Sequence, residues 1–313
     1  MKKLLVFLLI GLFHFCHRDY GYQNKPIVKE INLQGHRGAR GLRPENTLPA
    51  FDLAMRYKMK TLELDTVLTA DNNLIIHHDR KISADLCQNA DGTAIASKAI
   101  REMSVADLRK LDCGSKENPR FPEQKLIPKT PLVTLGEFLD HVLKQETEMG
   151  YKPHFNIEVK MKPGIRPDEF KLIANQLASE VEKRNLTNRT TVQCFNIEFL
   201  PFVKKRQPRF KLAALFAPTR FQGLMMILGG GDAYRDRLLA ASKRVGADII
   251  SPYYLAANPH LLHEAHKQNL QVIVWTVNET STMRELLEAG IDGIITDYPD
   301  RMRRVFTEFK KSS

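Results

Sequence analysis

From residue 31 onward, short β-branched or apolar runs alternate with longer segments of helical period. That alternation is typical of βα units stacked around a parallel sheet, and each strand comes first in its pair. Eight strands of this kind favour a closed α/β barrel. The predicted strands cover residues 31–36, 61–67, 154–160, 191–194, 211–216, 247–251, 271–276 and 293–296.

The intervening helices carry recognisable start and stop signals. Ser104 with Asp107, and Thr134 with Glu137, have the spacing of a capping box at a helix N-terminus. Gly290 follows an apolar helical run and is typical of a helix end. These signals support the helix assignments between the strands.

One stretch interrupts the alternation. Residues 80–130 are rich in turn dipeptides such as Asp91-Gly92 and Asn118-Pro119, with only a short helix predicted near residues 104–111. The stretch follows the second strand, so we expect an inserted cap on one rim of the barrel. On the catalytic rim, such a cap would shape the substrate pocket.

The N-terminus resembles an export signal. Lys2 and Lys3 precede an apolar run over residues 4–15, which is shorter than a membrane span. Cys16 ends the run, so lipidation there, simple cleavage and an uncleaved anchor all stay open. We expect a signal over residues 1–16, a linker over 17–30 and the barrel over 31–310, in a bacterial protein that is periplasmic or held at the membrane as a lipoprotein.

Export would place the cysteines in an oxidising compartment. Cys87 and Cys113 both lie in the irregular polar stretch, and we expect them to pair. Closing that loop would contribute roughly 3 kcal/mol to stability. Cys194 lies in a predicted strand without a neighbouring base, so we expect a buried, unreactive thiol.

The net charge of +11 raises the question of an anionic partner. The lysines and arginines are spread along the whole chain, so we interpret the charge as a surface bias and predict no nucleic-acid partner. A composition of 43% hydrophobic and 27% charged residues excludes a disordered or collagen-like chain.

Acidic side chains alternate with apolar ones in two predicted strands. Glu63 and Asp65 share one face of the second strand, while Asn156, Glu158 and Lys160 share one face of the third. Isolated ions at such buried positions would be very costly. One possibility is a solvent-facing edge or a structural ion-pair network. The other is a hard divalent cation, Mg²⁺ or Ca²⁺, held by Glu63, Asp65 and Glu158.

Two segments that follow apolar runs end in histidines. His36 is followed by Arg37 and Gly38, while His77 and His78 precede Asp79. Two imidazoles near a carboxylate cluster suit a hydrolase, in which one accepts a proton from the nucleophile and one protonates the leaving group. Arg37 adds a planar donor for a phosphate oxygen.

An ordered series of motifs resembles the glycerophosphodiester phosphodiesterase family over roughly residues 31–310. The match is specific because of its order, since a lone His-Arg-Gly would mean little. The series consists of His36-Arg37-Gly38, Pro44-Glu45-Asn46-Thr47, Glu63-Leu64-Asp65, His78-Asp79, Glu158-Val159-Lys160, Trp275-Thr276-Val277-Asn278 and the run from Asp292 to Pro299.

The resemblance implies a (β/α)8 TIM barrel with an insertion after the second strand. It also implies metal-dependent cleavage of a small-molecule glycerophosphodiester into sn-glycerol 3-phosphate and an alcohol. The implied metal ligands are Glu63, Asp65 and Glu158, and one Mg²⁺ or Ca²⁺ is the implied cofactor. The implied general base and acid are His36 and His78, and the implied substrate contacts are Arg37, Lys160 and Trp275.

Several alternatives stay open beside this resemblance. Trp275 could instead be a barrel-core residue, and His77 is an extra imidazole that departs from the family pattern. The same metal and histidines would serve a phospholipase C or sphingomyelinase D acting on intact lipid, for which residues 221–228 are the best apolar lip. A non-catalytic binding barrel is the third reading. The headgroup alcohol and the oligomeric state cannot be read from the sequence.

Overall fold

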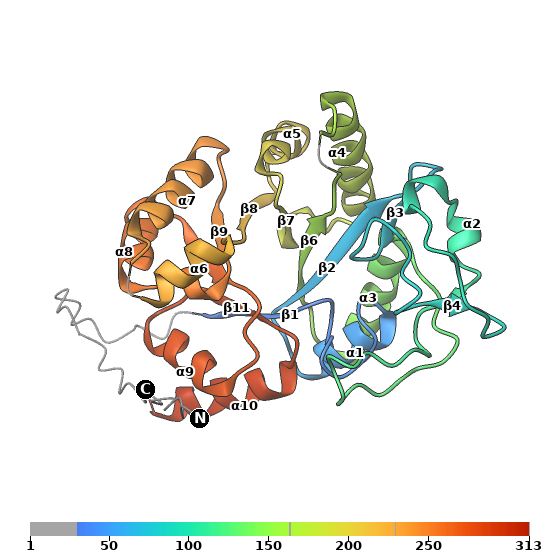
Figure 1. Cartoon of the computed structure of the whole chain (residues 1–313), viewed down its shortest axis with the longest axis horizontal. Helices are drawn as coiled ribbons and strands as arrows, with labels where there is room; N and C mark the ends of the chain where they lie inside the picture. The colour runs from blue at the N-terminus through green and yellow to red at the C-terminus, as the bar shows by residue number, and fades with distance from the viewer. Residues whose placement is uncertain (1–29, 163, 229, 313) are drawn as a thin grey trace, which may run out of the picture.

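The protein is described here from a computed structural model, which covers residues 30–162, 164–228 and 230–312. Eight parallel strands form a closed ring, because β1 pairs with β2 on one side and with β11 on the other (Figure 1). The predicted barrel is therefore confirmed. In ring order the strands are β1 (Asn32–Gly35), β2 (Thr61–Leu68), β6 (His154–Val159), β7 (Thr190–Cys194), β8 (Lys211–Phe216), β9 (Ile249–Pro252), β10 (Gln271–Val274) and β11 (Gly293–Thr296).

Helices surround this ring on the outside (Figure 1). One longer helix follows each barrel strand, as expected for a (β/α)8 barrel. These helices are α1 (Leu48–Arg56), α3 (Leu135–Met149), α4 (Pro167–Glu182), α5 (Leu200–Arg206), α7 (Asp232–Arg244), α8 (Pro259–Lys267), α9 (Thr280–Glu288) and α10 (Pro299–Ser312). Two extra helices, α2 (Val105–Leu108) and α6 (Arg220–Ile227), lie in connections between strands and these helices.

The strand period of two separates two environments. Leu62 and Leu64 of β2 belong to the large apolar core that also contains the inward faces of the helices. Glu63 and Asp65, between and beyond them, are buried on the other face of the strand. The side chains that sequence patterning placed on one face of β2 therefore lie inside the barrel.

The connection from β2 to α3 forms the cap. It includes β3 (Leu74–Ile76), which pairs antiparallel with β2, and the small β4–β5 ladder (Gln88–Asn89 with Leu111–Asp112). Its apolar residues make a second, smaller core. The predicted disulfide between Cys87 and Cys113 closes a 26-residue separation within the cap.

Several local predictions can be compared with the structure. Thr134 and Glu137 form the predicted capping box, and the Ser104 side chain accepts a hydrogen bond from Asp107 N. Gly290 follows α9 with a φ of 81°, a left-handed conformation that glycine adopts without strain. Over the described ranges, no helix combines the length and the apolarity that crossing a bilayer requires. The predicted signal, Cys16 and most of the predicted linker fall outside those ranges.

Candidate active site

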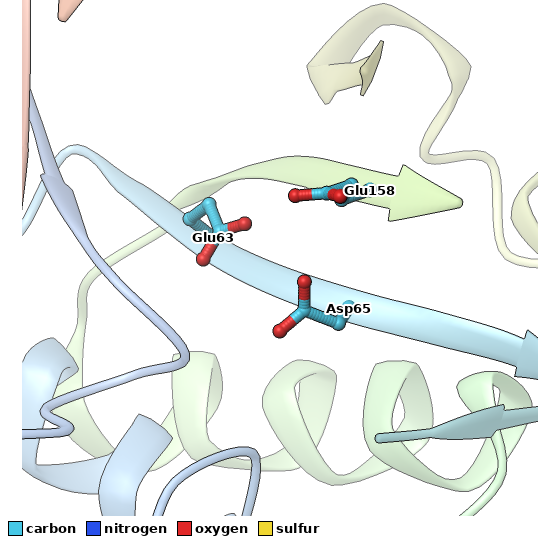
Figure 2. A group of neighbouring side chains, drawn as sticks. All are labelled: Glu63, Asp65 and Glu158. Carbon is cyan, nitrogen blue, oxygen red and sulfur yellow. The ribbon is translucent and has the colours of Figure 1, made fainter. Parts of the chain in front are cut away.

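Three carboxylates from neighbouring strands converge inside the barrel (Figure 2). Glu63 and Asp65 come from β2 and Glu158 from β6, and the strand register places Asp65 directly opposite Glu158. One oxygen from each group lies within 4.8 Å of the others. All three side chains are buried, so the predicted convergence is confirmed and the solvent-facing alternative is wrong.

Two cations lie against these carboxylates. Lys160 Nζ is 3.0 Å from Asp65 Oδ1 and also pairs with Glu158, while Arg37 Nε is 3.1 Å from Asp65 Oδ2. The Arg37 backbone N–H donates to Glu63 Oε2 at 2.9 Å. Arg37 and Lys160, which the sequence analysis expected at a phosphate, therefore lie beside the carboxylates. They offset two of the three negative charges.

The protonation states reflect this imbalance. Burial and the charge of Asp65 raise the pKa of Glu63 well above its usual value. Burial also raises the pKa of Glu158, to about 7, against the opposing effect of Lys160. Burial opposes ionisation of Asp65 as well, but Lys160 and Arg37 hold its pKa well below the usual range. The cluster therefore favours an ionised Asp65, whereas full ionisation of Glu63 and Glu158 requires a further positive charge nearby.

His36 lies at the end of β1, beside a carboxylate that the sequence analysis gave no role. Its Nδ1 is 2.6 Å from Asp297 Oδ1, and Asp297 Oδ2 accepts a hydrogen bond from the Asn278 side chain at 2.8 Å. With Nδ1–H donated to Asp297, the Nε2 lone pair of a neutral His36 is left to accept a proton. Burial lowers the pKa of His36 although Asp297 acts in the opposite direction.

The two adjacent histidines differ in environment. His77 is buried, and its Nδ1 lies 2.8 Å from the Asp79 carbonyl. His78 is part-exposed, with Nδ1 2.7 Å from Asp79 Oδ1, and it lies close enough to Asp65 to contribute to the lowered pKa of that carboxyl. Both line a small cavity between the cap and the β1–α1 loop. His78 is therefore the histidine with access to solvent beside the acidic cluster.

The β1–α1 loop contains Glu45 and Asn46, two residues of the Pro44-Glu45-Asn46-Thr47 motif for which no function was predicted. Glu45 accepts hydrogen bonds from Arg37 Nη1 at 2.6 Å and from Arg40 Nε at 2.7 Å. Asn46, at a φ of 57°, donates to Asp65 Oδ2 at 2.9 Å and accepts from the Asp65 backbone N–H. This loop fixes both Arg37 and Asp65 in place.

A polar network lies next to the acidic cluster inside the barrel. Gln193 of β7 donates to Glu63 Oε1 at 2.8 Å, and Asn156 of β6 donates to Gln193 and to Gln34. Gln193 and Gln34 carried no sequence signal, because a polar residue in a predicted strand is ordinarily exposed. The network fixes the orientation of the Glu63 carboxylate.

Trp275 directly follows β10, which β11 and β1 separate from β2 in the ring. Its ring meets Phe195 and Tyr253 edge-on, with centroids 5.4 Å and 5.6 Å apart. Lys160 Nζ lies 5.7 Å from the centre of the Phe195 ring, so this aromatic wall reaches the charged cluster. Trp275 is part-buried and its indole N–H donates to the Ser251 carbonyl.

The donor set fits a hard divalent cation. It consists of carboxylate oxygens only, which suit Mg²⁺ or Ca²⁺. Asp65 Oδ1 and Glu158 Oε1 are buried and, although near Lys160, accept no well-aligned hydrogen bond. Buried acceptors of this kind retain bonding capacity for a cation. Glu63, Asp65 and Glu158 could therefore hold one.

Comparison with known proteins points to one family. Residues 36–301 match the family model described as the glycerophosphoryl diester phosphodiesterase family. A glycerophosphodiester phosphodiesterase of Bacillus subtilis (strain 168) is 29% identical over 313 residues, which span 97% of this chain and 97% of that protein. One from Caldanaerobacter subterraneus subsp. tengcongensis is 27% identical, over 85% of this chain and 94% of its own.

Solved structures agree with this match. A crystal structure of a candidate glycerophosphoryl diester phosphodiesterase from Silicibacter pomeroyi DSS-3 has a TM-score of 0.81 and 28% identity, covering 91% of this chain and 96% of its own. An Oleispira antarctica phosphodiesterase, solved with the product sn-glycerol-3-phosphate, has a TM-score of 0.67 at 19% identity. It covers 88% of this chain and 96% of its own, and supports the fold alone.

Proposed function

This chain belongs to the glycerophosphoryl diester phosphodiesterase family, and from that premise we propose that it hydrolyses glycerophosphodiesters to sn-glycerol 3-phosphate and an alcohol. The observation that carries the proposal is the convergence of three buried carboxylates, two cations and the His36–Asp297 pair at one mouth of the barrel. In such barrels the catalytic groups come from the carboxyl ends of several strands.

Charge balance supports a divalent cation as part of the site. A bound dication would hold all three carboxylates ionised although burial raises the pKa of Glu63 and Glu158. The three charges then face two positive side chains, Arg37 and Lys160, which leaves one negative charge. A dication and a phosphodiester monoanion together add one positive charge, which cancels the remaining negative charge of the site. We propose that Glu63, Asp65 and Glu158 hold this ion as Mg²⁺ or Ca²⁺. When bound, it supplies Lewis-acid stabilisation of charge on the phosphoryl oxygens.

Arg37 and Lys160 are proposed to bind the phosphate. Both side chains are largely buried, and Glu45 holds the Arg37 guanidinium through Nη1 at 2.6 Å. A planar guanidinium and an ammonium in a site with little water stabilise oxygen charge more strongly than they would in bulk solvent. Trp275 and Phe195 are proposed to line the part of the mouth that receives the substrate.

The two histidines are proposed to move the protons. His36 is held by Asp297 with Nε2 free, and its lowered pKa keeps it neutral near pH 7, so it suits the base. His78 is proposed as the acid that protonates the departing alcohol oxygen when the phosphorus–oxygen bond breaks. The attacking oxygen belongs either to water or to the neighbouring glycerol 2-hydroxyl, which is held at high effective concentration.

A substrate that lacks this hydroxyl distinguishes the two routes. If the 2-hydroxyl attacks first and forms a cyclic phosphate, the 2-deoxy analogue of the substrate should turn over slowly. An unchanged rate on the analogue would exclude the neighbouring-group route and favour direct attack by water.

The central experiment measures release of sn-glycerol 3-phosphate from glycerophosphocholine. Activity should disappear with a chelator and return with added Mg²⁺ or Ca²⁺, and the ion that restores it identifies the cofactor. His36→Asn should lower turnover by roughly 100-fold or more. Activity that persists in chelator would contradict the metal role, and no activity with any divalent ion would contradict the enzyme proposal.

Intact phospholipid is the second candidate substrate. The observation that favours it is the group of exposed apolar residues on α6, where Phe221 is 71% and Ile227 is 57% exposed. Assaying intact phospholipid beside its deacylated headgroup ester separates the two substrates. Preference for the deacylated ester supports the first proposal.

Export is also proposed. The Cys87–Cys113 disulfide supports an oxidising compartment, since such bonds rarely persist in a reducing cytosol. Fractionation of bacterial cells tests this. Recovery of the chain with its two thiols reduced in the cytosolic fraction would contradict it.

A further inference from the structure

Helix α6 and its C-cap residue, Leu228, carry an unusual concentration of exposed apolar side chains. Phe221, Leu224, Met225, Ile227 and Leu228 are between 38% and 71% exposed, and only Met226 of this run is buried. The helix is well formed, because Thr219 and Gln222 make a reciprocal capping box at its start. Its exposed surface is therefore built by the sequence rather than left by a frayed end. We call these five residues the α6 patch.

The α6 patch lies on the rim that carries the candidate active site. α6 follows the carboxyl end of β8 and packs on the short turn Tyr254–Ala256, which follows β9. Tyr254 N–H donates to the Trp275 carbonyl at 2.9 Å, so α6, this turn and the aromatic wall are continuous. Figure 1 shows α6 across the barrel from the cap elements α2 and β4.

The connection that contains α6 carries charge of one sign. No aspartate or glutamate occurs between Glu198 and Asp232, and the connection that contains α6 carries one charge, Arg220. Throughout the part of the chain with described coordinates, no carboxylate pairs with Arg220. An apolar helix with an unpaired cation and no acidic residue complements a surface that combines anionic groups with hydrocarbon.

The composition of the α6 patch favours lipid over a second protein as its partner. All five side chains are more than a third exposed, and contiguous exposed apolar surface marks a site of protein or membrane contact. Protein interfaces surround such a core with a rim of polar side chains and hydrogen bonds. The connection that contains α6 has one charged side chain, Arg220, whereas a lipid surface takes up apolar side chains beside its headgroups without such a rim.

We propose that the α6 patch docks this protein on an anionic phospholipid bilayer, with Arg220 at the headgroups and the mouth of the barrel turned toward the lipid. The docking depends on surface chemistry alone and does not require turnover. It adds a membrane contact on the rim of the active site, whatever the substrate.

The test places an environment-sensitive fluorophore on α6 of the full chain. Gly223→Cys is a suitable position, because a side chain there meets no atom within 4 Å. Cys194 will not compete, since burial raises the pKa of its thiol to about 12, and Cys16→Ser removes the remaining cysteine of the sequence. The matched control is Lys205→Cys, an exposed position at the C-terminal end of α5 on the opposite rim.

Mixed phosphatidylglycerol and phosphatidylcholine vesicles should shift the emission of the label at position 223 to the blue and raise it at least about twofold. The label at position 205 should not change. A response at 205 without one at 223 would overturn the proposal. So would a label at 223 that is already shielded before vesicles are added, or one that responds to protein concentration alone, because another part of the chain or a second copy would then cover α6.

Introducing negative charge into the α6 patch provides the second arm. Leu224→Glu with Ile227→Glu alters two exposed positions and should abolish the response at 223, whereas Ala233→Glu with Ala240→Glu on exposed positions of α7 should preserve it. Equal loss in both variants would show that net charge, not the α6 patch, governs binding and would overturn the proposal. Pure phosphatidylcholine vesicles should give a weaker response, and an equal response would contradict the role of Arg220.

Discussion

The two halves of the barrel interior differ in chemistry. Strands β8 to β11 fill their half with small and branched apolar side chains, while β1, β2, β6 and β7 fill theirs with amides and carboxylates. The apolar set is Ala213, Ile249, Ile273 and Ile295, and the polar set is Gln34, Glu63, Asp65, Asn156, Glu158 and Gln193.

The apolar half of the interior contributes mainly to stability, and the polar half contributes mainly to the proposed chemistry. The apolar half gains free energy by burial, whereas the polar half must offset the desolvation of charged groups with partners such as Lys160 and Arg37. One half therefore resembles an ordinary barrel core, and the other is arranged for a cation and a substrate. Substitutions in the two halves should affect different measurements.

The largest effect is expected for Glu63→Gln in the polar half. The amide keeps the shape of the side chain but removes a proposed metal ligand, so glycerophosphocholine hydrolysis should fall at least ~1000-fold. Because burial disfavours the charge of Glu63, the thermal midpoint should stay the same or rise. Turnover above a tenth of wild type, or a folding defect that explains the loss, would contradict the proposed role.

Periodicity allowed much of this polar half to be predicted. The strands expected at 61–67 and 154–160 differ from β2 and β6 by one residue at their ends, since alternating apolar side chains fix both the strand and its face. Two strands adjacent in the ring then bring Glu63, Asp65 and Glu158 together. The disulfide was predictable as well, because two cysteines share one irregular segment.

Contacts across the ring could not be predicted from spacing. His36 and Asp297 are 261 residues apart and meet only because closure places β1 beside β11. In the sequence, Gln193 could not be distinguished from an exposed polar strand residue, but in the closed ring its side chain donates a hydrogen bond to Glu63. The antiparallel strand β3 was also missed, since a three-residue apolar run is too short to show a period.

The next largest effect is expected for Asp297→Asn. Asp297 holds the tautomer and orientation of His36, the proposed base, so its loss should lower kcat by roughly 100-fold. Asn278, which donates to the other Asp297 oxygen, offers a milder control in Asn278→Ala. Equal kcat values for wild type and Asp297→Asn would show that His36 needs no positioning by this carboxylate.

The pH dependence of kcat/KM provides a second comparison of wild type with Asp297→Asn. Burial lowers the pKa of His36 from its usual 6.5, so the base is neutral above that pH and activity should fall only as the pH drops below 6.5. Asp297 raises the pKa of His36 within the folded protein, so Asp297→Asn should lower it further. The acid limb of kcat/KM should therefore move to lower pH in the variant. A shift to higher pH would assign the limb to another group.

The smallest effect is expected in the apolar half. Ile273 is 2% exposed and packs with Ile249 and Ile295, so Ile273→Val removes one buried methylene and should lower the free energy of unfolding by about 1 kcal/mol. Because the carboxylate cluster lies on the other half, glycerophosphocholine hydrolysis should stay within about twofold of wild type. Denaturant unfolding and the activity assay on the same preparation test both. A large loss of activity at full stability would mean that the apolar half also positions the reacting groups, and the separation between the halves would then fail.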